Sequence, residues 1–188
     1  MKITSGKYKY RKLELPKGAR PTTEKVREAV FSMVMPWLDG ALVMDMFAGS
    51  GAMGLEALSR GADHCYFSEL SRPGFKVLLS NIAGCEAGEE CTVFNSDYTS
   101  AIERVAKLGI TMDVVFMDPP YDKTEYYEDA MLLLQENNLL DEGSIVVAEH
   151  LYDNKLSDTY DNLHRIKEKR YGSIGVDVFI YEIEAESE

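Results

Sequence analysis

The sequence predicts one α/β domain with a mainly parallel sheet. Short apolar runs typical of buried strands alternate five times with helical patterns, and a hairpin pattern follows them. A glycine-rich turn comes directly after the first of these strands. The 188 residues suffice for a single domain with a sizeable core. We divide the chain into a basic extension of short strands and a helix over residues 1–38 and a sheet domain over residues 39–188.

Composition excludes several classes of protein. The chain is 45% hydrophobic and 28% charged, which is ordinary for a globular protein. No apolar run approaches the ~20 residues of a membrane span, and the first residues lack the apolar region of a secretory signal. We therefore expect a cytoplasmic protein. The three cysteines, an odd number without Cys-x-x-Cys spacing, predict free thiols rather than disulfides or structural zinc.

Charge is distributed unevenly along the chain. The net charge is −12, yet residues 1–30 hold nine Lys/Arg against three Glu. Such an arm either contacts nucleic acid or is simply a solvated basic segment. Within it, Tyr8 lies among lysines and is followed by Arg11 and Lys12. These residues either stack on a base and hold phosphates or pack on the body as strand residues.

The first elements follow from turn and cap signals. Residues 2–20 contain alternating apolar residues between glycines and predict one or two short strands or a hairpin. Thr23 is a plausible N-cap for a helix that Pro36 ends. The polar residues Arg20 and Thr22 flank a proline just before this helix, where packing does not require them.

The next stretch predicts a nucleoside site. A strand over residues 41–46 leads into Gly49-x-Gly51-x-x-Gly54 and a helix over 52–60, and the next strand ends at Glu69. Glycines at this turn let the backbone approach a ligand, and Glu69 can accept both ribose hydroxyls. Asp45 brings negative charge into the turn, which disfavours a pyrophosphate and favours a cationic ligand.

The remaining elements alternate regularly. We expect helices over residues 71–83, 99–107 and 124–138, strands over 91–95, 114–117 and 144–149, and a final hairpin over 164–182. Asn81 lies near a helix end, where a polar residue is more often solvated. Asp97 follows the third strand and either meets a ligand or caps the next helix. Glu149 closes the fifth strand, where it either holds a substrate base or has only a local role.

Asp118-Pro119-Pro120-Tyr121 is the most distinctive stretch. It follows a buried strand, so it lies at the carboxyl end of the sheet, where open α/β sheets bind ligands. The prolines have no N–H, so their carbonyls and the Asp118 carboxylate form a group of acceptors suited to a substrate amine. Tyr121 offers a flat face for stacking. The alternative is a loop in which the prolines only end a strand.

Three stretches together resemble the RsmD family of bacterial methyltransferases, which use S-adenosylmethionine to modify guanine N2 of 16S ribosomal RNA. Residues 118–121 resemble the [DNS]-P-P-[YFW] motif of amino methyltransferases, and the other two stretches are Arg20–Phe31 and Asp45–Ala62. The resemblance extends from Lys2 to about Gly172. The chain departs from the family at Tyr10, where a Gly-Arg pair is usual.

The resemblance implies a Rossmann-like class I methyltransferase fold, with a mainly parallel seven-stranded sheet whose last strand is antiparallel. The implied cofactor is S-adenosylmethionine. The implied partner is 16S ribosomal RNA within a small-subunit particle, with no membrane and no metal, and we expect a monomer. The implied catalytic residues are Asp118, Pro119, Pro120 and Tyr121. The cofactor-binding residues are Thr22, Asp45, Phe47, Ala48, Gly49, Ser50, Gly51, Glu69 and Asp97, and the substrate-binding residues are Tyr8, Arg11, Lys12 and Arg20.

Other functions remain open from the sequence. The same amine pocket suits adenine-N6 methylation of DNA or glutamine methylation of a protein. The glycine spacing and Glu69 also fit a nicotinamide-dependent oxidoreductase, although that function leaves residues 118–121 unexplained. A non-catalytic ribosome-assembly factor would use the basic arm alone. The three histidines are scattered and none accompanies a candidate nucleophile, so we expect no covalent enzyme intermediate.

Overall fold

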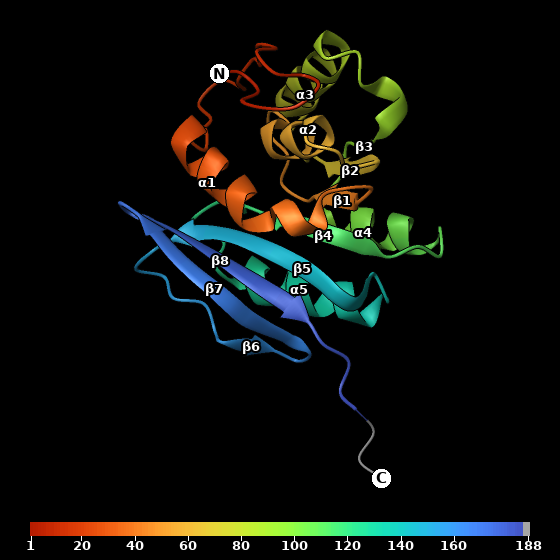
Figure 1. The fold of residues 1–188 in the computed structure, drawn as a ribbon, viewed down its shortest axis with the longest axis vertical. Coiled ribbons are helices and arrows are strands. Elements are labelled where there is room, and N and C mark those ends of the chain that lie inside the picture. The colour runs from red at the N-terminus through yellow and green to blue at the C-terminus, as the bar shows by residue number, and fades with distance from the viewer. Residues whose placement is uncertain (186–188) are drawn as a thin grey trace.

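The computed structural model describes residues 1–185, so the last three residues of the predicted 39–188 domain lie outside its description. Within this part, eight strands form one sheet in the order β3-β2-β1-β4-β5-β8-β7-β6 (Figure 1). The strands are β1 Leu42–Asp45, β2 His64–Ser68, β3 Cys91–Phe94, β4 Met112–Met117, β5 Leu140–Leu151, β6 Thr159–Tyr160, β7 Leu163–Tyr171 and β8 Ile174–Tyr181. Strands β1 to β5 are parallel, and β8 is antiparallel to both β5 and β7.

The fold class is therefore confirmed, with one more strand than the seven expected. The extra strand, β6, has two residues and pairs only with β7 at the edge of the sheet. Strand β5 begins four residues earlier than predicted, because Leu140 pairs with Met112 before a register irregularity. A short polar stretch thus joins the sheet through backbone pairing that its sequence pattern does not reveal.

Helices cover both faces of the sheet. They are α1 Glu24–Val34, α2 Ala52–Ser59, α3 Arg72–Gly84, α4 Tyr98–Ala106 and α5 Glu125–Glu136, with short 3-10 turns at Met35–Trp37 and Gly88–Glu90. Along β4, Val114 and Phe116 pack with α1, α2 and α3, whereas Val115 and Met117 pack with α4 and α5. This alternation puts apolar side chains on both faces, as expected for a central parallel strand.

The strand order reverses between β1 and β4. From β1 the chain proceeds outward to β2 and β3, and then returns to add β4 and β5 on the other side of β1. Open α/β sheets bind ligands at this reversal, beyond the carboxyl ends of the strands. The loop after β1 and the Asp118–Tyr121 stretch after β4 therefore lie at the same edge of the sheet.

The N-terminal segment folds back on itself as the expected hairpin would, but its pairing is too short to form strands, and it packs against α2. Its β-type pairing is a bridge between Lys2 and Lys12, flanked by backbone bonds from the Ile3 N–H to the Arg11 carbonyl at 3.0 Å and from the Leu13 N–H to the Met1 carbonyl at 2.8 Å. Other N–H groups bond to α2: Thr4 to the Glu56 carboxylate at 3.0 Å and Lys7 to the Ser59 carbonyl at 2.9 Å. The donors of the segment are thus satisfied partly by short pairing within it and partly by α2. Every helix within residues 1–185 is too short or too polar to span a bilayer.

Candidate active site

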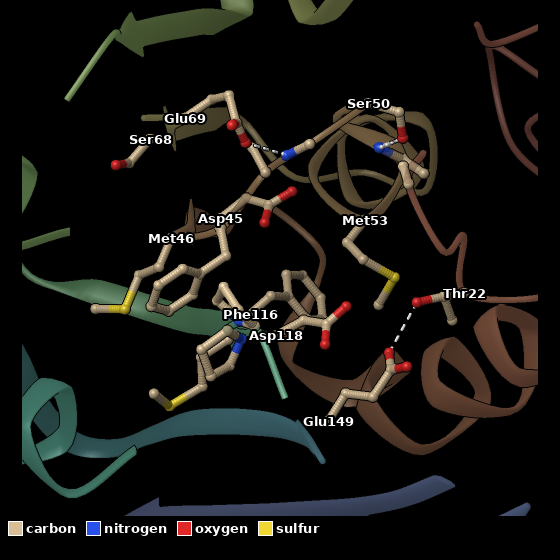
Figure 2. A pocket seen from close by; sticks show the side chains of 18 of the residues that line it. Thr22, Asp45, Met46, Ser50, Met53, Ser68, Glu69, Phe116, Asp118 and Glu149 are labelled. Atoms are coloured by element: carbon tan, nitrogen blue, oxygen red, sulfur yellow. Dashed lines mark hydrogen bonds between the residues drawn. The ribbon is translucent and has the colours of Figure 1, made fainter. Parts of the chain in front are cut away.

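A cavity of about 1050 Å³ opens at the carboxyl ends of β1 and β4. Its walls come from the loops after β1 to β4, from the end of β5 and from most of residues 15–22 (Figure 2). It brings together most of the residues expected from the sequence: Arg20, Thr22, Asp45, Phe47, Ala48, Gly49, Ser50, Glu69, Asp97, Asp118, Pro119, Pro120 and Tyr121. Their chemical roles stay predictions.

The glycine turn is shaped by its backbone. Gly49 and Gly51 have φ of 52° and 82°, in the left-handed region that favours glycine. A Cβ on Gly51, the N-cap of α2, would lie 2.4 Å from the Leu78 side chain. The Gly49 N–H donates to Glu69 Oε2 at 2.7 Å, which joins the turn to the end of β2. Gly51 itself does not line the cavity, although its neighbours Ser50 and Ala52 do.

Asp45 lies beneath this turn and is buried. The N–H of Gly54 donates to its Oδ2 at 3.1 Å. Burial raises the pKa of the Asp45 carboxyl to about 7; the Gly54 bond opposes this shift and the charge of Glu69 adds to it. A cation placed in the cavity would favour the ionised carboxylate, and an added phosphate would not.

Asp97 caps a helix as well as lining the cavity. Its Oδ1 accepts the N–H of Ser100 at 2.8 Å at the start of α4. The two interpretations left open by the sequence are thus compatible, since the second carboxylate oxygen has no partner among residues 1–185. Next to it, Tyr98, Phe47 and Tyr126 form an aromatic group, with the Phe47 and Tyr98 ring centroids 5.4 Å apart. Tyr98 and Tyr126 line the cavity but had no distinguishing signal in the sequence.

The Asp118–Tyr121 stretch forms one wall of the cavity, directly after β4. Burial raises the pKa of the Asp118 carboxyl well above its usual value, and the charges of Glu149 and Asp45 add to the effect. Burial likewise raises the pKa of Tyr121 to about 12, with Glu149 and Asp118 adding to it and Arg20 opposing it. Tyr121 is therefore a neutral phenol at physiological pH.

Glu149 joins this wall from β5. Its Oε2 accepts a hydrogen bond from the Thr22 hydroxyl at 2.7 Å, across 127 residues of sequence (Figure 2). The hydroxyl of Tyr127 bonds to its backbone carbonyl at 2.6 Å. Thr22, expected to bind cofactor, thus uses its hydroxyl to hold a second carboxylate in the cavity. In the sequence, only its position at the end of a predicted strand distinguished Glu149 from other acidic residues.

Asn81 is buried, so the expectation of a solvated residue was wrong. Its side-chain amide donates to the Ser50 carbonyl at 2.8 Å and to the Glu14 carbonyl at 2.9 Å. Its oxygen accepts the Glu14 N–H at 2.8 Å. Asn81 therefore ties the glycine turn to the N-terminal segment. Its helix covers the turn, and this contact could not be read from the position within the helix.

Three expected substrate-binding residues lie away from the cavity. Tyr8 is 9% exposed, and its hydroxyl bonds to Glu90 at 2.9 Å. Arg11 and Lys12 are exposed, and Arg11 donates to the Gly84 carbonyl at 3.3 Å. The exposed aromatic of the arm is Tyr10, 65% accessible. Its φ of 72° is glycine-like, which matches the family's glycine at this position.

The histidines, cysteines and acids form neither a metal cluster nor a disulfide in the part of the chain that the structure describes. No group of three or more His, Cys, Asp or Glu residues there is arranged to hold a metal ion. The three cysteines are free thiols: Cys65 and Cys85 are buried, and Cys91 is half-buried. Burial raises the pKa of Cys91 to about 12, which keeps that thiol protonated.

Comparisons with known proteins agree on one family. The family model "Conserved hypothetical protein 95" matches residues 1–180. Ribosomal RNA small subunit methyltransferase D of Escherichia coli (strain K12) is 34% identical over 190 residues, covering 100% of this chain and 93% of that protein. The Bacillus subtilis (strain 168) protein YlbH is 35% identical over 181 residues, which cover 95% of this chain and 98% of that protein. The solved structure of Escherichia coli yhhF has a TM-score of 0.85 and 35% sequence identity, and the match covers 97% of this chain and 98% of that one.

Proposed function

This chain belongs to the RsmD family of ribosomal RNA small subunit methyltransferases, and we propose that it transfers a methyl group from S-adenosylmethionine to N2 of a guanine in 16S ribosomal RNA. The substrate is the RNA within a small-subunit particle. Residues 1–38 serve as a basic extension, whose exposed Arg11 and Lys12 meet phosphates while Arg20 contributes to the cavity. The remaining residues form the catalytic domain.

The acceptor-rich wall at residues 118–121 carries this proposal. The Asp118 carboxylate and the carbonyls of Pro119 and Pro120 offer oxygens, and the two prolines have no N–H. An exocyclic amine has two hydrogens to give, so it finds partners there that a carbonyl or a phosphate would not. Tyr121 stacks on a base that has been flipped out of its helix. An amine on a planar ring is therefore the substrate that this wall fits best.

The donor set also fits a cationic nucleoside cofactor. Glu69 at the end of β2 meets the ribose hydroxyls, as such acids do in this fold, and Asp97 meets the adenine amino group. The cofactor lies close to the backbone of the glycine turn, which includes Phe47, Ala48 and Ser50. S-adenosylmethionine supplies a methyl group on a sulfonium, with a neutral thioether as leaving group. The buried Asp45 favours that positive charge and would repel the pyrophosphate of a nicotinamide dinucleotide.

The protein acts mainly by positioning. The lone pair of guanine N2 is delocalised into the ring, so the amine is a poor nucleophile. Asp118 and the Pro119 carbonyl accept its two N–H bonds and favour a pyramidal nitrogen. Transfer forms a C–N bond and breaks the C–S bond, and Asp118 accepts the proton that the nitrogen loses. Holding the reactants in this geometry supplies much of the rate.

The test is transfer of a labelled methyl group. The purified protein is incubated with unmethylated small subunits, naked 16S RNA and DNA, and the products are digested to nucleosides. We expect N2-methylguanosine from the RNA samples. Label in DNA adenine or in protein glutamine would replace this proposal with the rival methyltransferases. Binding to the small subunit without any methyl transfer would favour an assembly factor. Binding of NAD would favour an oxidoreductase.

Asp118→Ala provides the matched test of the wall. We expect transfer to fall at least about 10²-fold, because the amine loses its charged acceptor, while S-adenosylmethionine still binds. Asp63→Ala is the control, since Asp63 is exposed and precedes β2 at the opposite edge of the sheet. Near-wild-type turnover of Asp118→Ala would remove Asp118 from the mechanism.

A further inference from the structure

Glu149 and Asp118 occupy matching positions on neighbouring strands. The register of β4 and β5 pairs Met117 with Ala148, so the next residue on each strand comes at the same level. Side chains at the same level of adjacent parallel strands project from the same face of the sheet. Both carboxylates accordingly point into the cavity (Figure 2). One of them belongs to the amine-binding wall, and the other has no role in the mechanism above.

Glu149 is held in place with one oxygen left over. The Thr22 hydroxyl donates to Oε2 at 2.7 Å, and Tyr127 anchors the backbone carbonyl at 2.6 Å. No hydrogen bond from residues 1–185 reaches Oε1. A fixed carboxylate oxygen that faces a cavity without a donor is a site for a ligand N–H.

The chemistry of the bases identifies that N–H. In guanine the exocyclic amine is adjacent to N1–H, so two neighbouring positions are donors. In adenine and cytosine the ring nitrogen beside the amine carries a lone pair and accepts. An anionic oxygen next to the amine site is therefore favourable for guanine and repels the other two bases.

We propose that Glu149 is the residue that selects guanine, by accepting the N1–H of the flipped base while Asp118 and Pro119 accept the N2 hydrogens. This inference rests on the proposed function and adds its base specificity. Thr22 acts as a positioning residue that aims the Glu149 carboxylate.

The surroundings of the two acids shift their pKa values for partly different reasons. Burial raises the pKa of both carboxyls, but the Thr22 hydrogen bond and His150 oppose the shift at Glu149. At Asp118 the charges of Glu149 and Asp45 add to burial. The N–H donors of a bound guanine favour the ionised form of both acids, whereas adenine has no donor at its ring nitrogen to offer Glu149.

The experiment compares two bases at the target position. The modified guanine is first located by mapping the wild-type product. Small subunits are then reconstituted with ligated 16S RNA carrying either guanine or 2-aminopurine there. 2-Aminopurine keeps the N2 amine but has a lone pair at N1. We expect the wild type to prefer guanine by on the order of 10- to 100-fold, the range for one hydrogen bond to a charged group.

Glu149→Gln is the decisive variant, because it has the same shape and its amide can donate to the N1 lone pair. We expect the guanine preference to shrink at least about tenfold, with S-adenosylmethionine affinity unchanged. Thr22→Val should reduce the preference in the same direction. Glu136→Gln, on the exposed end of α5, is the control and should keep the wild-type ratio.

The outcomes separate this inference from the proposed function. The preference is a ratio within one variant, so a partly unfolded preparation does not alter it. If Glu149→Gln lowers transfer to both bases equally, or changes neither, Glu149 is only structural and the inference is overturned while N2 methylation stands. If the wild type makes no N2-methylguanosine, the proposed function is wrong, and the inference that rests on it is wrong as well.

Discussion

Replacing the Asn81 amide by a carboxyl should destabilise the whole protein. Asn81→Asp preserves the shape of the side chain but turns its NH₂ donor into an acceptor. The two carbonyls that the amide now meets, Ser50 at 2.8 Å and Glu14 at 2.9 Å, would then face an oxygen. The Glu14 N–H would keep its bond to the other oxygen. The variant therefore isolates two hydrogen bonds at a site that is 3% exposed.

The expected cost follows from those two bonds. Leaving a buried polar group without its partner costs about 1–3 kcal/mol, so for two groups we expect a loss of roughly 2–6 kcal/mol. That is a large part of the ~5–15 kcal/mol stability of a typical domain. For a chain of this size it corresponds to a melting temperature lower by on the order of 5–20 °C. Because Ser50 belongs to the glycine turn, affinity for S-adenosylmethionine should fall as well.

Urea unfolding at several pH values tests the reasoning. Burial and two facing carbonyls raise the native pKa of the introduced carboxyl above its unfolded value of about 3.9. The native state then binds more protons, so the penalty is smallest below about pH 4 and grows as pH rises through the native pKa. Asn154→Asp, at an exposed position, is the control. A loss under about 0.5 kcal/mol at neutral pH, or one independent of pH, would refute the account.

Two further predictions concern buried charges. Glu56→Gln should lower the free energy of unfolding by about 3–5 kcal/mol, because Arg27, fully buried 3.1 Å from Glu56, would lose its counter-ion. Urea titration measures this, and a change below about 1 kcal/mol would contradict it; adding Arg27→Met should recover part of the loss. Because the Asp45 pKa is raised to about 7, S-adenosylmethionine should bind more tightly as pH rises from 6 to 8. The neutral thioether product, S-adenosylhomocysteine, should not gain this way, and calorimetry yielding a constant ratio of the two affinities would rule out contact between Asp45 and the sulfonium.

Local sequence signals determined the elements and the edge of the sheet where the cavity lies. Thr23, Ser71 and Asp97 each cap a helix through their side chains, as their residue types allow. The apolar runs predicted the parallel strands, and their order along the chain implied a shared carboxyl edge. Residues 45–51 and 118–121 could be brought together from the sequence because topology alone puts strand ends side by side.

Tertiary packing decided which side chains meet. Nothing near Thr22 in sequence indicates that its hydroxyl bonds to Glu149, and nothing near Asn81 indicates that it joins Ser50 to Glu14. In the arm, Tyr8 is buried whereas Tyr10 is exposed. Hydrophobic periodicity and helix caps depend on residues only a few positions apart, so they can be recognised in a short stretch of sequence. A hydrogen bond across 127 residues depends on how strands and helices dock, and docking is a property of the whole core.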